Sequence, residues 1–344
     1  MTQTISKRVK VVRTDRELEC PKLDAALHAR GVELVLLPDG ISEADLMVAV
    51  RDATLLLMCY TPITASVINA APQLRGIVKY GVGIDAIDIP AARARRIPVV
   101  NVPEYAGETV AEGAFLMLLA LAKKLLPIHQ AMQTAGWAWP TSHWLASDIA
   151  GKTVGLLGVG RIGRSLARMA GLGFRARMLG YDPNVSTEEM LQAGVEKCED
   201  LHAMLGECDF VSLHCVLNDT TRHLIGAREL AAMKRSACLI NVSRGALVDE
   251  VALLKALQDR TIAGAGLDVF SEEPLRHQGH PLRALYAMEN VILSPHLTFF
   301  TKEAMERLED ETLERCIEVL ENRPVQVKSR DPRLTAQEFG IVLR

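Results

Sequence analysis

The sequence lacks a strong excess of charge of one sign, and it lacks the paired cysteines of metal and redox motifs. Its 39 Lys and Arg residues nearly balance 42 Asp and Glu residues, which gives a formal net charge of −3 at pH 7. This balance argues against a surface adapted to polyanions in general. The chain has seven cysteines, an odd number, and no CxxC pair. We therefore expect reduced, mostly buried thiols in a cytoplasmic protein.

Long hydrophobic runs are also missing. The most apolar stretch spans residues 114–122 and ends at Lys123 and Lys124, whereas a membrane-spanning helix needs roughly 20 apolar residues. The first ten residues have no apolar segment behind their charges, so we expect no signal peptide. The apolar stretch instead predicts a helix buried on most sides, between domains or between subunits. Residues 109–112 (TVAE) fit a capping box at its start.

The remaining pattern is a regular alternation of strands and helices. Hydrophobic residues make up 49% of the 344 residues and charged residues 24%, which is typical of globular proteins of about two domains. Short strand-like runs alternate with helical patterns up to residue 100, and the alternation restarts at Lys152. This alternation of strands and helices predicts an α/β fold with parallel sheets. The last long helical pattern, residues 302–321, is expected to return to the first domain. We assign no structure to residues 323–344.

A glycine-rich turn follows the predicted strand at residues 154–157 and reads Gly158-Val159-Gly160-Arg161-Ile162-Gly163. Gly158 permits the tight turn, Gly160 lets the backbone approach a pyrophosphate, and Gly163 lets the next helix pack closely on the strand. The N–H groups around Arg161 and Ile162, at the helix start, then bind phosphate oxygens. Alone, GxGxxG is a weak signal, because such a turn also occurs in domains that bind no nucleotide. Here it lies between a strand and a helix, as a dinucleotide site requires.

The nature of the dinucleotide depends on Asp182. This residue lies about 20 positions after Gly163 and follows a predicted strand, where an acidic side chain accepts hydrogen bonds from the ribose hydroxyls. Its charge repels a 2′-phosphate, and the next two residues, Pro183 and Asn184, provide no cation. The sequence therefore predicts NAD rather than NADP.

Three polar residues in the second half of the chain lie at or just after the ends of predicted strands: Arg244, Glu273 and His296. Ligands bind at this edge of open α/β sheets. Together the three suit hydride transfer at a 2-oxo acid: Arg binds the carboxylate, His moves a proton to or from the carbonyl oxygen, and Glu orients the imidazole. Taken singly, each has a simpler interpretation, as a surface charge, a helix-start acid or a loop histidine.

Two further segments contain candidate ligand-binding residues. Residues 79–85 (KYGVGID) follow a strand, and the two glycines suit either a nest of N–H groups for a substrate carboxylate or an ordinary turn. His277 and His280 lie near Glu272 but have no defined ligand spacing, so we expect no metal site.

At this point the sequence resembles the D-isomer-specific 2-hydroxyacid dehydrogenase family, over about residues 50–320. Six motifs carry the resemblance: YGVGIDAID (80–88), NVPEYAGETVAE (101–112), GKTVGLLGVGRIG (151–163), NVSRGALVDE (241–250), GLDVFSEEP (266–274) and NVILSPH (290–296). The resemblance implies a Rossmann NAD-binding domain at residues 104–299. It also implies a flavodoxin-like, discontinuous substrate domain at residues 1–103 and 300–344. A homodimer through the helix at residues 113–126 is a further implication.

The resemblance also implies roles for single residues. Arg244 would bind substrate as the catalytic arginine, Glu273 would be the partner carboxylate, and His296 the acid/base. Val82 and Gly83 would also bind substrate, and Asp268 would contact the nicotinamide carboxamide. The nicotinamide side would be lined by Cys215, Val242 and Ser243.

The expected activity is that of an NAD-dependent oxidoreductase that transfers hydride between nicotinamide and C2 of a small D-2-hydroxy or 2-oxo acid. Two alternatives stay open. One is an NAD(H)-sensing, co-repressor-like binding protein. The other is a formate- or phosphite-type dehydrogenase, although the resemblance implies Gln at the position of Glu273 in the formate branch.

Overall fold

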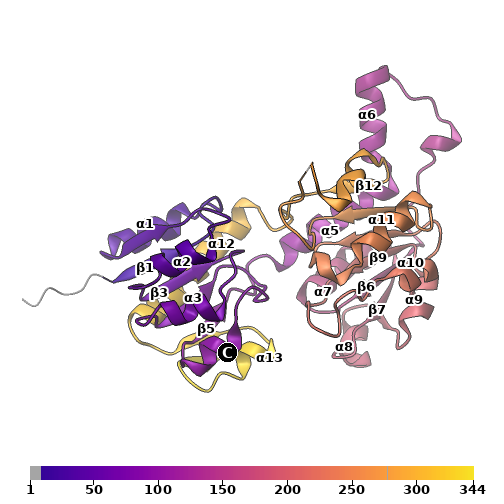
Figure 1. Cartoon of the computed structure of the whole chain (residues 1–344). Helices are drawn as coiled ribbons and strands as arrows, with labels where there is room; N and C mark the ends of the chain where they lie inside the picture. Colours follow the sequence, from indigo (N-terminus) through magenta and orange to yellow (C-terminus); the bar gives the residue numbers. More distant parts are fainter. Residues whose placement is uncertain (1–8, 277) are drawn as a thin grey trace, which may run out of the picture. The chain divides into compact units, whose positions relative to one another are not determined.

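The computed structural model describes residues 9–276 and 278–344, so the first eight residues and His277 lie outside the description. The described chain divides into two compact units (Figure 1). The first contains the described part of residues 1–106 together with Thr301–Arg344, and the second is Gly107–Phe300. The boundaries expected from the sequence were 103/104 and 299/300. The assignment of one unit to substrate and the other to NAD stays a prediction.

The first unit is built on a five-stranded sheet in which all strands are parallel and follow the order β2-β1-β3-β4-β5. Strands β3 and β4 are buried along their whole length, as expected for a sheet covered on both faces. The strands are β1 (Lys10–Arg13), β2 (Glu33–Leu36), β3 (Leu55–Met58), β4 (Gly76–Lys79) and β5 (Val99–Asn101). The helices that precede the second unit are α1 (Pro21–Ala29), α2 (Glu43–Ala49), α3 (Ala65–Ala70) and α4 (Ile89–Ala94).

The C-terminal part of the chain completes this unit. Helix α12 (Lys302–Leu320) returns to the first sheet: a Cβ at Gly76 would lie 2.7 Å from Val319. The segment that the sequence left unassigned forms β13 (Val325–Val327), α13 (Pro332–Thr335) and β14 (Ile341–Leu343). The side chain of Gln337 bonds both the N–H and the carbonyl oxygen of Val99 at 2.8 Å, and so ties this segment to strand β5.

The second unit contains a seven-stranded parallel sheet in the order β12-β11-β10-β9-β6-β7-β8. Strand β6 pairs with β7 on one side and β9 on the other, so the order reverses at β6, where ligands bind in open α/β sheets. The strands are β6 (Thr153–Leu157), β7 (Arg177–Tyr181), β8 (Glu196–Lys197), β9 (Phe210–Leu213), β10 (Cys238–Asn241), β11 (Gly264–Leu267) and β12 (Val291–Leu293). The predicted α/β class with parallel sheets is confirmed.

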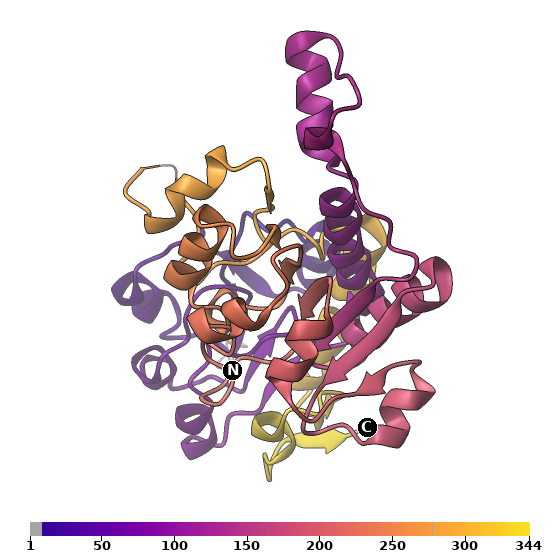
Figure 2. The same cartoon turned by 90° about the vertical axis from the view of Figure 1, so that its right-hand side faces the viewer.

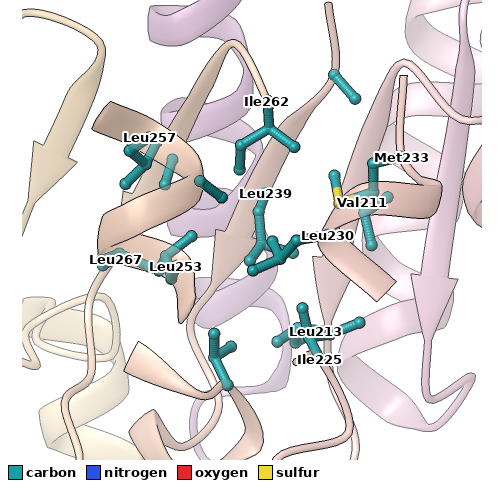
Figure 3. Close-up of a cluster of buried hydrophobic side chains, with 14 of the residues drawn as sticks. Val211, Leu213, Ile225, Leu230, Met233, Leu239, Leu253, Leu257, Ile262 and Leu267 are labelled. Atoms are coloured by element: carbon teal, nitrogen blue, oxygen red, sulfur yellow. The ribbon is translucent and has the colours of Figure 1, made fainter. Parts of the chain in front are cut away.

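Helices cover this second sheet. Apolar side chains of β9, β10 and β11 meet those of α10 and α11 in one buried cluster, which includes Val211, Leu239 and Leu253 (Figure 3). The helices are α5 (Gly107–Ala122), α6 (Leu125–Ala135), α7 (Arg161–Ala167), α8 (Thr187–Gln192), α9 (Leu201–Glu207), α10 (Ala227–Ala232) and α11 (Glu250–Gln258). Short turns of 3-10 or π type are η1 (Ser142–Trp144), η2 (Arg168–Gly173), η3 (Gly245–Leu247) and η4 (Pro281–Ala287).

The apolar helix differs from its prediction in two ways. Helix α5 begins at Gly107, so Thr109 lies inside the helix and the predicted capping box is wrong. The residues at 113–126 do not form one helix, because Lys124 adopts a left-handed conformation (φ 50°) and α6 begins after it. Within the second unit, α6 extends away from the sheet in both views (Figures 1 and 2), and none of its residues is buried. Among the described residues, no helix is both long and apolar enough to cross a bilayer.

Candidate active site

The glycine turn after β6 is tight at two positions and open at the third. Gly158 has a φ of +93°, and a Cβ there would lie 2.6 Å from the backbone nitrogen of Cys215. A Cβ at Gly163 would lie 2.4 Å from the Gly158 carbonyl oxygen. A Cβ at Gly160 would meet nothing within 4 Å. The first and third glycines are therefore required by packing, while Gly160 leaves room above the backbone. This arrangement fits a dinucleotide pyrophosphate.

Helix α7 begins directly after this turn, with Arg161 and Ile162 as its first residues. The first N–H groups of a helix have no partner within the helix, and they carry the positive end of its dipole. The structure thus places these two residues where the sequence expected a phosphate to bind.

Asp182 lies beside the same turn, at the end of β7. One carboxylate oxygen accepts the Val159 N–H at 2.9 Å, and the other accepts the Asn184 N–H at 2.9 Å. These bonds fix the carboxylate against the glycine turn. Because each oxygen can accept more than one hydrogen bond, the group keeps acceptor capacity for a ribose diol.

His296 and Glu273 form a direct pair. His296 Nδ1 lies 2.9 Å from Glu273 Oε2, and the other Glu273 oxygen accepts the Phe270 N–H at 2.9 Å. The buried Phe299 ring and the imidazole form a T-shaped pair, with the ring centres 6.3 Å apart. The two side chains, 26% and 33% exposed, are accessible to a small ligand.

The charge state of Glu273 follows from these contacts. Burial alone raises the pKa of Glu273, but the hydrogen bond and charge of His296, the Phe270 N–H and the charge of Arg244 lower it. The net pKa lies below the ordinary value of 4.5. Glu273 is therefore ionised at neutral pH, and it can only accept in its bond to His296.

Arg244 lies after β10, and its charge is one of those that lower the pKa of Glu273. Its Nη1 donates to the Ser243 carbonyl oxygen at 2.7 Å, and its own carbonyl oxygen accepts from Asn241 at 2.8 Å. Asn241 also accepts the Ser243 N–H at 3.1 Å. Sequence reasoning missed Asn241 as the side chain that shapes this loop, although it stands in the same NVSRGALVDE motif.

Asp268 is fully buried and holds the segment that carries His296. Its carbonyl oxygen accepts the His296 N–H at 2.8 Å, and its carboxylate accepts the N–H groups of Leu297 and Thr298 at 2.9 and 3.1 Å. The Thr298 hydroxyl donates to the same carboxylate at 2.6 Å. The contact of Asp268 with the nicotinamide carboxamide stays a prediction, whereas its support of the histidine loop is visible.

The other residues expected near nicotinamide join the ends of β9 and β10. The Ser243 hydroxyl donates to the Cys215 carbonyl oxygen at 2.7 Å, and Val242 is buried next to it in the chain. Burial raises the pKa of the Cys215 thiol to about 11, so this thiol is protonated at neutral pH.

His214, which the sequence did not single out as a site residue, lies one position before Cys215. Burial lowers the pKa of its imidazole to about 3, and Nε2 lies 2.9 Å from the Ser212 hydroxyl. His214 is therefore a neutral imidazole beneath the glycine turn.

The remaining candidates lie in the first unit and in the loop before η4. Val82 and Gly83 follow β4, where Asn101 fixes the Val82 carbonyl oxygen at 2.6 Å. Among the described residues, no group of three or more His, Cys, Asp or Glu side chains is arranged to hold a metal ion. His280 instead accepts the Leu282 N–H at 3.1 Å, as the N-cap of η4. His277 lies outside the described residues.

Comparison with known proteins agrees with this geometry. Residues 115–298 match the model of the D-isomer-specific 2-hydroxyacid dehydrogenase, NAD-binding domain. A glyoxylate reductase from Korarchaeum cryptofilum is 41% identical over 271 residues, which cover 78% of this chain and 80% of that protein.

Solved structures agree as well. The D-lactate dehydrogenase of Aquifex aeolicus, complexed with NAD and lactic acid, matches with a TM-score of 0.80 and 29% identity, over 90% of this chain and 95% of that one. An acyclic imino acid reductase in complex with NADPH and D-Arg matches with a TM-score of 0.81 and 26% identity, over 92% and 98%. The expected family and NAD as its cofactor are confirmed, and the chain belongs to the D-isomer-specific 2-hydroxyacid dehydrogenases.

Proposed function

We propose that this dehydrogenase interconverts a small 2-oxo acid and its D-2-hydroxy acid, with His296 as the acid/base. The observation that carries the proposal is the 2.9 Å contact between His296 Nδ1 and the ionised Glu273. Because an ionised carboxylate can only accept, Nδ1 must carry a proton in this contact. The proton that reaches or leaves the substrate oxygen is therefore the one on Nε2 of the same ring.

Arg244 would bind the substrate carboxylate through its guanidinium, which suits planar anions. Val82 and Gly83 stay predicted substrate contacts. Asp182 and the turn from Gly158 to Gly163 would hold the dinucleotide, with Asp268, Cys215, Val242 and Ser243 on the nicotinamide side. Bound NADH would supply the hydride while His296 donates the proton to the 2-oxo acid. In the reverse direction NAD⁺ would accept the hydride while His296 removes the hydroxyl proton.

A panel of 2-oxo acids tests this proposal. NADH consumption is measured with glyoxylate, pyruvate, hydroxypyruvate and longer 2-oxo acids. Turnover of at least one, with the D-hydroxy acid as product, is expected. Tight NADH binding without turnover of any of them would favour the sensor-type alternative. NAD⁺ reduction with formate or phosphite alone would favour a formate- or phosphite-type dehydrogenase.

We further propose that the protein is a homodimer. Large apolar side chains are exposed along α5, α6 and the segment that follows: Leu116 is 62% exposed, Leu125 52%, Trp137 60% and Trp139 74%. Exposed apolar area of this kind marks interaction surfaces. Most apolar residues of α5 are already buried within the second unit. The proposed interface therefore depends on the exposed side chains of α5 and α6 and on the tryptophans, more than on residues 113–126 as a whole.

The state of the thiols is the one expected in a reducing compartment. All seven cysteines are free, and five of them are buried. This supports the proposal of a cytoplasmic protein.

A further inference from the structure

A second charged pair lies next to Asp182. Arg164, in the first part of α7, donates from Nε to the Val159 carbonyl oxygen at 3.0 Å, and the Val159 N–H donates to Asp182 at 2.9 Å. A terminal nitrogen of Arg164 lies 3.7 Å from Glu189 Oε1, on helix α8. The single residue Val159 thus links the guanidinium to the carboxylate that is expected to receive the ribose.

We propose that Arg164 and Glu189, together with Asp182, set the preference of this enzyme for NAD over NADP. Glu189 neutralises and holds a guanidinium that is otherwise suited to bind the 2′-phosphate. A phosphate monoester carries close to two negative charges at neutral pH, and Arg binds it through two parallel hydrogen bonds. The 2′-phosphate of NADP would take the place of the 2′-hydroxyl of NAD, which we expect to meet Asp182.

The local charges support this assignment. Two carboxylates and one guanidinium leave an excess of negative charge around Asp182, where the ribose is expected, so a 2′-phosphate should be repelled although a cation is near. The ion pair is weak, because its side chains are 33% and 48% exposed and make one contact at 3.7 Å. The guanidinium can therefore exchange Glu189 for a better anion once the repulsion is reduced.

Glu189 also offers a substitution that spares the fold. Its other oxygen accepts the Ser186 N–H at 3.1 Å and completes the capping box of α8. Glutamine serves in this position as well, because its amide oxygen can accept the same hydrogen bond. Glu189→Gln therefore removes the charge and keeps the helix start.

The experiment measures the Kd of NADH and of NADPH by fluorescence titration. The proteins are the parent, Glu189→Gln, Asp182→Ser and the double variant, each with and without Arg164→Gln. Glu189→Gln should tighten NADPH binding about 3- to 10-fold and change NADH binding less than 2-fold, since only one ligand carries the extra charge. The double variant should tighten NADPH binding further. Arg164→Gln should remove most of the gain, and raised salt should weaken the gained NADPH affinity more than NADH affinity.

A matched control separates this effect from a change in overall charge. Arg177 and Glu196 form another exposed ion pair, at the opposite end of β7. Glu196→Gln should leave both Kd values unchanged. An equal gain in NADPH affinity from Glu196→Gln would overturn the proposal, as would a gain in the double variant that survives Arg164→Gln.

The single variants keep the test decisive if Asp182→Ser does not fold. In that case the proposal stands only if Glu189→Gln tightens NADPH binding and Arg164→Gln, added to it, reverses the gain. The readout is nucleotide affinity, so failure of the 2-oxo acid panel or of the acid/base assignment is recorded separately.

Discussion

Asp268 holds His296 through the backbone and also holds the two residues that follow it. The backbone carbonyl of Asp268 accepts the His296 N–H at 2.8 Å, while its carboxylate binds the N–H groups of Leu297 and Thr298. His296 itself has a positive φ of 59°, which is uncommon outside glycine. The conformation of this loop therefore depends on a buried carboxylate.

Replacing Asp268 by Asn should loosen the histidine loop. The amide group places a donor where one of the bound N–H groups needs an acceptor, and an unsatisfied buried group costs about 1–3 kcal/mol. We expect a lower free energy of unfolding by about that amount and a reduced kcat. Urea unfolding and steady-state kinetics measure the two. Thr298→Val is the control, because it removes only the hydroxyl donor and should have the smaller effect on kcat.

Replacing His296 by Asn should remove the proton donor and leave the nucleotide site intact. We expect kcat to fall by about 10²-fold or more, which is the usual contribution of a positioned acid/base. NADH affinity, measured by fluorescence titration, should stay within a few-fold of the parent. Unchanged turnover in this variant would take His296 out of the mechanism.

The lowered pKa of Glu273 predicts an acid-dependent loss of stability. A carboxyl whose pKa is lower in the folded state than in the unfolded chain stabilises the fold above its unfolded pKa, near 4.5. That contribution is lost as the pH falls through the lower, folded pKa. Urea unfolding between pH 7 and pH 3 measures it, and Glu273→Gln should flatten the profile. If the free energy of unfolding of the variant falls as steeply with decreasing pH as that of the parent, Glu273 does not contribute to the acid-dependent loss of stability.

Two glycines of the same turn should respond differently to alanine. At Gly163 the new Cβ would lie 2.4 Å from a backbone oxygen, so we expect destabilisation of about 1–3 kcal/mol from overpacking. At Gly160 the Cβ meets no protein atom within 4 Å, so the melting temperature should hardly change. NADH affinity should nevertheless fall about 10-fold or more, because the methyl group occupies the space of the pyrophosphate. Equal effects on melting temperature would contradict the packing argument.

The proposed homodimer predicts a surface variant that dissociates it. Leu125→Glu places a charge among the exposed apolar side chains at the start of α6 and should yield monomers in analytical ultracentrifugation. Leu191→Glu, at an even more exposed position on α8 (70% exposed, against 52% for Leu125), is the control and should remain dimeric. A parent protein that is already monomeric at micromolar concentration would refute the homodimer.

The sequence predicts best what is local along the chain. Strand β6, the glycine turn and α7 are contiguous, so their spacing alone indicated a dinucleotide site. The pairing of His296 with Glu273 needed one more assumption, namely that β11 and β12 are neighbours whose ends lie at one edge of the sheet. The contact between Arg164 and Glu189 was out of reach, because it depends on how α7 and α8 are placed relative to each other.

The start of α5 was misplaced for a related reason. The capping-box pattern at Thr109 indicates one helix start, but the helix begins two residues earlier, at Gly107. Likewise, nothing in the composition of residues 123–126 marks Lys124 as the left-handed residue that ends one helix and begins another. The folding of residues 323–344 rests on contacts such as that of Gln337 with Val99, which no short-range pattern reveals.

Helix α6 has 11 residues, none of them buried. Isolated helices of that length are only marginally stable in water, because the free-energy cost of forming the first turn exceeds what the next few turns contribute. In a dissociated chain this segment should therefore fray, and in an assembly it should become rigid. The amide exchange rates of residues 125–135, measured over a dilution series, should therefore report the fraction of the protein that is assembled.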